Sequence, residues 1–147
     1  MANRLLTPEL KKALVNYPLY SQDGKGKDAT CVARFFIGGF TWYVLEGNEE
    51  GDDFTFFGIV IGSDIEYGYF SANEMASITV PVPELHCDLR IVADESFQSC
   101  KVSQIKDQRL QDYLISFERH SAWSFTRRCS TGCRRLFLFS NLNNYIK

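Results

Sequence analysis

The hydrophobic pattern is clearest between residues 53 and 70, in the run DFTFFGIVIGSDIEYGYF. Its first half is apolar at consecutive positions, so both faces of a strand there would be buried, as in the interior of a sheet. Its second half alternates, with Ile65, Tyr67 and Tyr69 on one face. Gly62-Ser63 suits a two-residue type II′ turn, because glycine readily adopts the positive φ of the first central position. The run therefore predicts a β-hairpin.

Other strands are predicted on both sides of this hairpin. The runs CVARFFI (31–37) and FTWYVLE (40–46) flank Gly38-Gly39, which indicates a second hairpin. Residues 47–53 form the expected acidic turn between the two hairpins, and residues 85–92 are expected to return as an edge strand. Short connections favour an antiparallel meander, because parallel strands need long crossovers.

Apolar residues at helical spacing predict an amphipathic helix on either side of the strands. The first begins at Pro8 with Thr7 as its cap, and the second covers residues 103–120. Ser71 and Glu74 form a capping box that predicts a short helix directly after the central hairpin. The expected fold class is α+β: an antiparallel meander with an N-terminal helix and a C-terminal helix packed on it.

The size of the chain favours one domain. Its 147 residues fit the usual domain length and are 45% hydrophobic, enough for a core. It has no apolar run long enough to span a membrane and no apolar leader, so a soluble protein of the bacterial cytoplasm is expected. Its odd number of cysteines indicates reduced thiols rather than a disulfide framework.

Charge is distributed unevenly along the chain. Residues 35–89 contain ten acidic residues and no Lys or Arg, although the net charge of the whole chain is only −2. If these acidic side chains gather on one surface, that surface would attract a basic partner and repel nucleic acid. The alternative is a solvated acidic loop. The candidate partner-binding residues are Glu49, Glu50, Asp52, Asp53, Asp64 and Glu66.

A second candidate surface lies near the C-terminus, where arginines alternate with aromatic residues. Guanidinium groups neutralise phosphates and aromatic rings stack on bases, so nucleic-acid contact is one interpretation of this segment. The alternative is pairing with a partner protein or within the chain. The four arginines are Arg127, Arg128, Arg134 and Arg135.

Zinc binding is conceivable at Cys129 and Cys133, with His120, His86 and Cys87 as further ligands. Structural zinc sites use four ligands in closely spaced pairs, however, and neighbouring residues on a strand point to opposite faces. Buried or inert thiols are the favoured interpretation. The sequence predicts no metal ion and no other cofactor.

Three glutamates are candidates for acid–base catalysis: Glu46, Glu66 and Glu74. Glu66 is the strongest because it lies between bulky neighbours on a strand. Paired carboxyl groups must lie a few ångström apart for such chemistry, and nothing in the spacing of these residues fixes that distance. No nucleophile motif or phosphate-binding loop occurs. A small enzyme using Glu66 is therefore an alternative, and no catalytic residue is assigned.

Four stretches resemble, in order, a family of short uncharacterised bacterial and phage proteins. They are LLTPEL (5–10), TWYVLEG (41–47), FFGIVIGSDIEYGYFS (56–71) and HCDLR (86–90). The last stretch departs from the family pattern, since His86-Cys87 replaces an acidic-basic pair. The resemblance divides the single domain 1–147 into a family-like core, residues 1–94, and a helical and basic extension, residues 95–147.

The resemblance implies a role in mobile-element biology. Members of this family are cargo of plasmids, phages and integrative elements, often beside antirestriction proteins. The expected function is an accessory protein, not an enzyme, that binds and blocks a restriction nuclease or CRISPR effector of the host. The family offers no catalytic residues to carry over, and the oligomeric state stays open.

Overall fold

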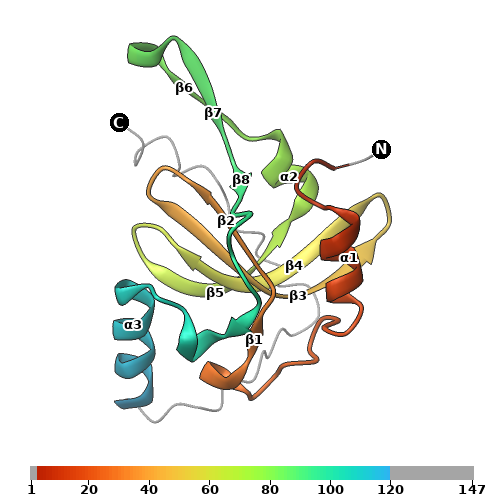
Figure 1. The fold of residues 1–147 in the computed structure, drawn as a ribbon, viewed down its shortest axis with the longest axis vertical. Helices are drawn as coiled ribbons and strands as arrows, with labels where there is room; N and C mark the ends of the chain where they lie inside the picture. Colours follow the sequence, from red (N-terminus) through yellow and green to blue (C-terminus); the bar gives the residue numbers. More distant parts are fainter. Residues whose placement is uncertain (1–2, 120–147) are drawn as a thin grey trace.

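A five-stranded antiparallel sheet forms the centre of the fold in the computed structural model, which describes residues 3–119 of the chain (Figure 1). Its strand order is β5-β4-β3-β2-β8, so β2 to β5 are neighbours in sequence order. The meander and the flanking helices confirm the α+β prediction. The strands are β2 (Ala33–Ile37), β3 (Phe40–Glu50), β4 (Asp53–Ile61), β5 (Ile65–Ser71) and β8 (Val92–Ala93).

Smaller elements surround the sheet. Two short pairs, β1 with β9 and β6 with β7, are hydrogen-bonded outside the main sheet. Their bounds are β1 (Thr30–Cys31), β6 (Thr79–Val82), β7 (Cys87–Arg90) and β9 (Cys100–Lys101). The helices are α1 (Pro8–Leu14), α2 (Ala72–Ser77) and α3 (Gln108–Arg119), with 3-10 turns η1 (Gly26–Asp28), η2 (Pro83–Leu85) and η3 (Val102–Gln104).

Both faces of the sheet are covered, which explains why β4 is apolar at consecutive positions. Successive residues of β3, such as Trp42 and Tyr43, belong to two different hydrophobic clusters. The first cluster includes Leu10 of α1 and Met75 of α2, and the second includes Leu110 of α3. The prediction that the first arm of the central hairpin is buried on both faces is therefore confirmed, because β4 is buried from its second residue to its last.

The predicted helix caps are also confirmed. The Thr7 hydroxyl accepts a hydrogen bond from the Leu10 amide at 3.2 Å, with Pro8 in the first helical position. Ser71 caps α2 in the same way, accepting from the Glu74 amide at 3.2 Å. The helix predicted over residues 103–120 begins later, at Gln108, because the preceding segment forms η3.

The turns differ from the predictions. The pairing of Ile61 with Ile65 leaves three residues in the central turn, and Gly62 does not have a positive φ. A Cβ atom on Gly62 would lie 2.4 Å from the Phe40 ring. Glycine is therefore required at this position because a larger residue would clash with Phe40, and not because the backbone has an unusual conformation. The predicted type II′ turn is therefore wrong.

The acidic turn is much shorter than residues 47–53. Strand β3 continues through Glu50, which pairs with Asp53, so only Gly51 and Asp52 connect the strands. Gly51 has a φ of 60°, the left-handed conformation that glycine adopts without a steric penalty. Most of the acidic segment is thus strand, and its side chains have fixed directions.

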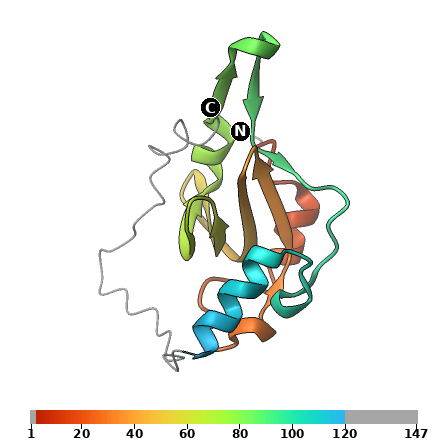
Figure 2. The same cartoon turned by 90° about the vertical axis from the view of Figure 1, so that its left-hand side faces the viewer.

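The edge strand expected over residues 85–92 is replaced by two separate elements. Strands β6 and β7 form a hairpin that stands beyond the end of the sheet (Figures 1 and 2), and only β8 pairs with β2. At its tip, Leu85 is 65% exposed and His86 has a φ of 52°. Several candidate residues of the sequence analysis lie outside the described residues, namely His120 and the C-terminal cysteines and arginines.

Candidate functional site

The turn between β3 and β4 carries four of the six candidate partner-binding residues. Glu49 and Asp52 are exposed, whereas Glu50 and Asp53 are partly buried. The Glu49 carboxylate forms an ion pair with Lys11 of α1 at 3.2 Å, and its side chain remains 69% exposed. An exposed pair of this kind contributes little to stability, so Glu49 can change partners at small cost.

Asp53 has a structural task within this turn. Its carboxyl group accepts hydrogen bonds from the Ser71 hydroxyl and, at 3.0 Å, from the Asn73 amide. The Asn73 side chain donates in turn to the Asp52 carbonyl at 2.9 Å. These bonds tie the acidic turn to the start of α2. Glu49 and Asp52 are the exposed acidic residues of this turn.

Asp64 and Glu66 lie at the opposite end of β4. Both are exposed, in and just after the β4–β5 turn. Asp53 begins β4 and Ile61 ends it, so the two acidic groups are separated by about 26 Å at the usual rise of a strand. The structure therefore divides the six acidic residues into two groups at opposite ends of the sheet.

Glu46 is fully buried, with 0% exposure, and both of its carboxyl oxygens are occupied by backbone amides. The Tyr20 amide donates to one oxygen and the Gln22 amide to the other, each at 2.8 Å. Gln22 continues the network, donating from its side chain to the carbonyls of Thr30 at 2.8 Å and Leu45 at 2.7 Å. Glu46 thus fastens the loop after α1 to a bulge in β3.

The other two catalytic candidates lie on different elements. Glu66 is exposed on the edge strand β5, and Glu74 is exposed in the first turn of α2. The structure does not bring the three glutamates together as a catalytic pair. Glu66 does act on Tyr113 of α3, whose pKa is raised first by burial and then by the negative charge of Glu66.

The metal candidates are divided in a similar way. His86 and Cys87 are exposed at the tip of the β6–β7 hairpin, whereas His120, Cys129 and Cys133 lie outside the described residues. Within residues 3–119, no three His, Cys, Asp or Glu side chains are grouped so that they could hold a metal ion. The same part of the chain contains no helix long and apolar enough to cross a membrane.

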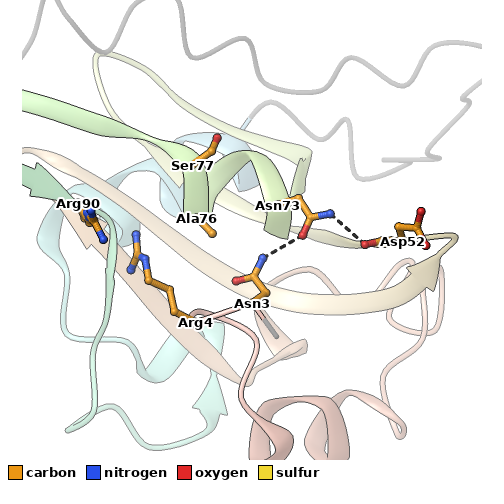
Figure 3. Close-up of a pocket in the computed structure, with 7 residues that line it drawn as sticks. All are labelled: Asn3, Arg4, Asp52, Asn73, Ala76, Ser77 and Arg90. Carbon is orange, nitrogen blue, oxygen red and sulfur yellow. Dashed lines mark hydrogen bonds between the residues drawn. The ribbon is translucent and has the colours of Figure 1, made fainter. Parts of the chain in front are cut away.

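Two cavities adjoin the acidic turn, and three residues line both of them: Asn3, Asp52 and Asn73. The larger has a volume of about 780 Å³ and extends toward β7 (Figure 3). Two arginines line it, Arg4 from the segment before α1 and Arg90 from the end of β7. The smaller, of about 350 Å³, lies between the turn and α1 and is lined by Lys11, Glu49 and Asp53 among others.

Sequence reasoning missed the larger cavity because its residues come from distant parts of the chain. One signal was present: Arg4 directly precedes the LLTPEL motif, and Arg90 ends the HCDLR motif. These two arginines indicate a common site only once the fold shows that the LLTPEL and HCDLR motifs lie close together.

Fold and site together describe a small α+β protein with an acidic turn beside a cavity lined by arginines. A family described as a protein of unknown function (DUF2958) matches residues 5–108, and the chain belongs to that family. The matched region passes beyond HCDLR to include β9 and η3. No curated protein and no solved structure matches the chain.

Proposed function

We propose that this protein is a mobile-element accessory that antagonises a host defence system by binding a restriction nuclease or a CRISPR effector. The resemblance of four motifs to those of short plasmid and phage proteins supports this proposal. The protein acts without catalysis, by occupying a surface that its partner needs for nucleic acid.

The observation that carries the proposal is the exposed acidic turn. Glu49 and Asp52 are exposed on a hairpin in a stretch of 55 residues, 35–89, that contains no Lys or Arg, and Glu49 pairs with the exposed Lys11 of α1. A nuclease binds DNA or RNA through a basic groove, and complementary charge accelerates association with such a groove. The rigid β3–β4 hairpin, held to α2 by Asp53, presents this charge in a fixed position.

The second acidic group provides a matched control. Glu49→Lys with Asp52→Lys changes the net charge by the same amount as Asp64→Lys with Glu66→Lys, at the other end of β4. None of these four side chains is buried, so both double variants should fold. A nonspecific effect of net charge would weaken both proteins equally, whereas docking through the β3–β4 turn affects only the first.

The test measures how efficiently a plasmid becomes established in isogenic bacteria with and without a restriction or CRISPR system. The wild-type protein should raise establishment only in the strains that carry the system. The variant E49K/D52K should lose this effect, and D64K/E66K should retain it. Equal activity of the two variants would contradict the assigned surface, and no protection against any tested system would contradict the function.

A further inference from the structure

The larger cavity beside the acidic turn has basic residues at one end and an acidic residue at the other, and its arginines have no part in the proposed function. Figure 3 shows Arg4 and Arg90 at one end and Asp52 at the other, with Asn73 between them. Its volume of about 780 Å³ falls within the usual range of small-molecule sites, about 300–1,000 Å³. The cavity is therefore large enough for a ligand of that size.

The arginine end has positive charge that the described residues do not balance. Arg4 donates from Nη1 to the Ile91 carbonyl, which fixes its guanidinium, but neither Arg4 nor Arg90 forms an ion pair within residues 3–119. Burial and the nearby charge of Arg90 both lower the pKa of Arg4, in that order of importance. Two guanidinium groups placed together favour an anion that accepts from both.

Hydrogen-bond capacity supports the same conclusion. A guanidinium has five N–H donors, so most donors of Arg4 and Arg90 remain available. The nearby amides also bond to one another and to the turn, because Asn3 donates to the Asn73 side chain at 3.2 Å and Asn73 donates to the Asp52 carbonyl. A phosphate group fits two neighbouring guanidinium groups, since it has enough oxygens to accept bidentate hydrogen bonds from both.

Two oxygen-bearing side chains of the cavity, Ser77 and Asp52, can accept hydrogen bonds from a ligand. Ser77 donates its hydroxyl proton to the Glu74 carbonyl at 2.7 Å, so its oxygen can only accept from a ligand. The Asp52 carboxylate makes no hydrogen bond to another described side chain and is exposed. The arginine donors at one end and the Asp52 carboxylate at the other match a molecule with a phosphate and hydroxyl groups.

We propose that this cavity binds the phosphomonoester of a sugar or nucleotide, with the phosphate between Arg4 and Arg90 and the sugar hydroxyls toward Asp52. The site shares Asp52 with the partner-binding turn, but Arg4 and Arg90 have no part in the proposed partner binding, so substitution of Arg90 separates the two proposals. It makes Arg4 and Arg90 the affinity-determining residues, and Asp52 the residue that distinguishes a sugar phosphate from inorganic phosphate.

Isothermal titration calorimetry at low salt tests the site with ribose 5-phosphate, inorganic phosphate and a DNA oligonucleotide that lacks terminal phosphates. Wild-type protein should bind ribose 5-phosphate saturably and more tightly than inorganic phosphate. Arg90→Gln should weaken that binding at least tenfold. Arg109→Gln, an exposed position on α3 with the same change in charge, should leave it within twofold.

Two further variants keep the test decisive. Arg4→Gln also loses the bond to Ile91, so its thermal unfolding must be compared with that of R90Q, which loses no such bond. Asp52→Asn should weaken ribose 5-phosphate but not inorganic phosphate. Absence of saturable binding, equal affinities of R90Q and R109Q, or binding confined to the oligonucleotide would overturn the proposal.

Discussion

Replacing Glu46 removes the acceptor that holds the loop after α1 against the sheet. In Glu46→Ala, the amides of Tyr20 and Gln22 lose their partner, and the site is too enclosed for water to replace it without rearrangement. In Glu46→Gln, one carboxyl oxygen becomes an NH₂ group that faces an N–H donor. The alanine variant should therefore be less stable than the glutamine variant, and both less stable than the wild type.

The structure sets the size of each effect. A buried donor left without its acceptor costs about 1–3 kcal/mol, so E46Q should lose about 1–3 kcal/mol and E46A about 2–6 kcal/mol. Domains of this size are stable by about 5–15 kcal/mol, so the larger loss would leave a substantial unfolded fraction. Tyr20 adds to the effect, because its left-handed φ of 73° is held in place by the bond to Glu46.

Urea unfolding measures these losses, with the fluorescence of the fully buried Trp42 as one probe and circular dichroism as a second. Glu49→Gln is the control, because an exposed ion pair contributes about 0–1 kcal/mol. Hydrogen exchange should increase at residues 20 and 22 in E46Q. If the free energy of unfolding of E46Q were within about 0.5 kcal/mol of the wild-type value, Glu46 would not hold the loop after α1 against the sheet. A chemical role for Glu46 would then have to be considered again.

Three other perturbations have defined outcomes. Gly58→Ala places a Cβ 1.8 Å from the Tyr43 carbonyl oxygen and should lower the melting temperature strongly, whereas Gly39→Ala, with no atom within 4 Å, should not. Burial and the hydrogen bond to Asp107 raise the pKa of Tyr43 to about 12. Between pH 10 and 12 the unfolded state releases this proton and the folded state keeps it, so the free energy of unfolding should fall over that range. Urea midpoints should show a smaller fall in Tyr43→Phe. Asp53→Ala should cost about 1 kcal/mol, measured by thermal unfolding, because the Asn73 amide in the first turn of α2 loses its acceptor while Ser71 still caps the helix.

The parts of the fold predicted from sequence depend on local chemistry. Thr7 and Ser71 cap helices through hydrogen bonds to residues three positions away. The consecutive apolar residues of β4 are enough to predict that both faces of this strand are buried. Neighbouring strands joined by short turns leave few alternatives to a meander. These features need no knowledge of distant contacts, so pattern reasoning recovered them.

The features that were missed depend on distant contacts. The central turn is one residue longer than predicted, and Gly62 is needed there because Phe40, from another strand, occupies the space beside it. Glu46 was considered as a catalytic group, but its role is set by amides of the loop after α1. The cavity between Arg4 and Arg90 exists only because the N-terminal segment meets the end of β7. Sequence spacing contains no information about such meetings.

The most direct test of the proposed function is capture of the partner. Tagged wild-type protein and the E49K/D52K and D64K/E66K variants are incubated with lysate of defence-bearing bacteria, with and without added nuclease, and captured proteins are identified by mass spectrometry. The proposal predicts a restriction nuclease or CRISPR effector that survives nuclease treatment, is lost with E49K/D52K and is kept with D64K/E66K. Capture of nucleic acid and nuclease-sensitive proteins alone would contradict it and direct attention to Arg127, Arg128, Arg134 and Arg135.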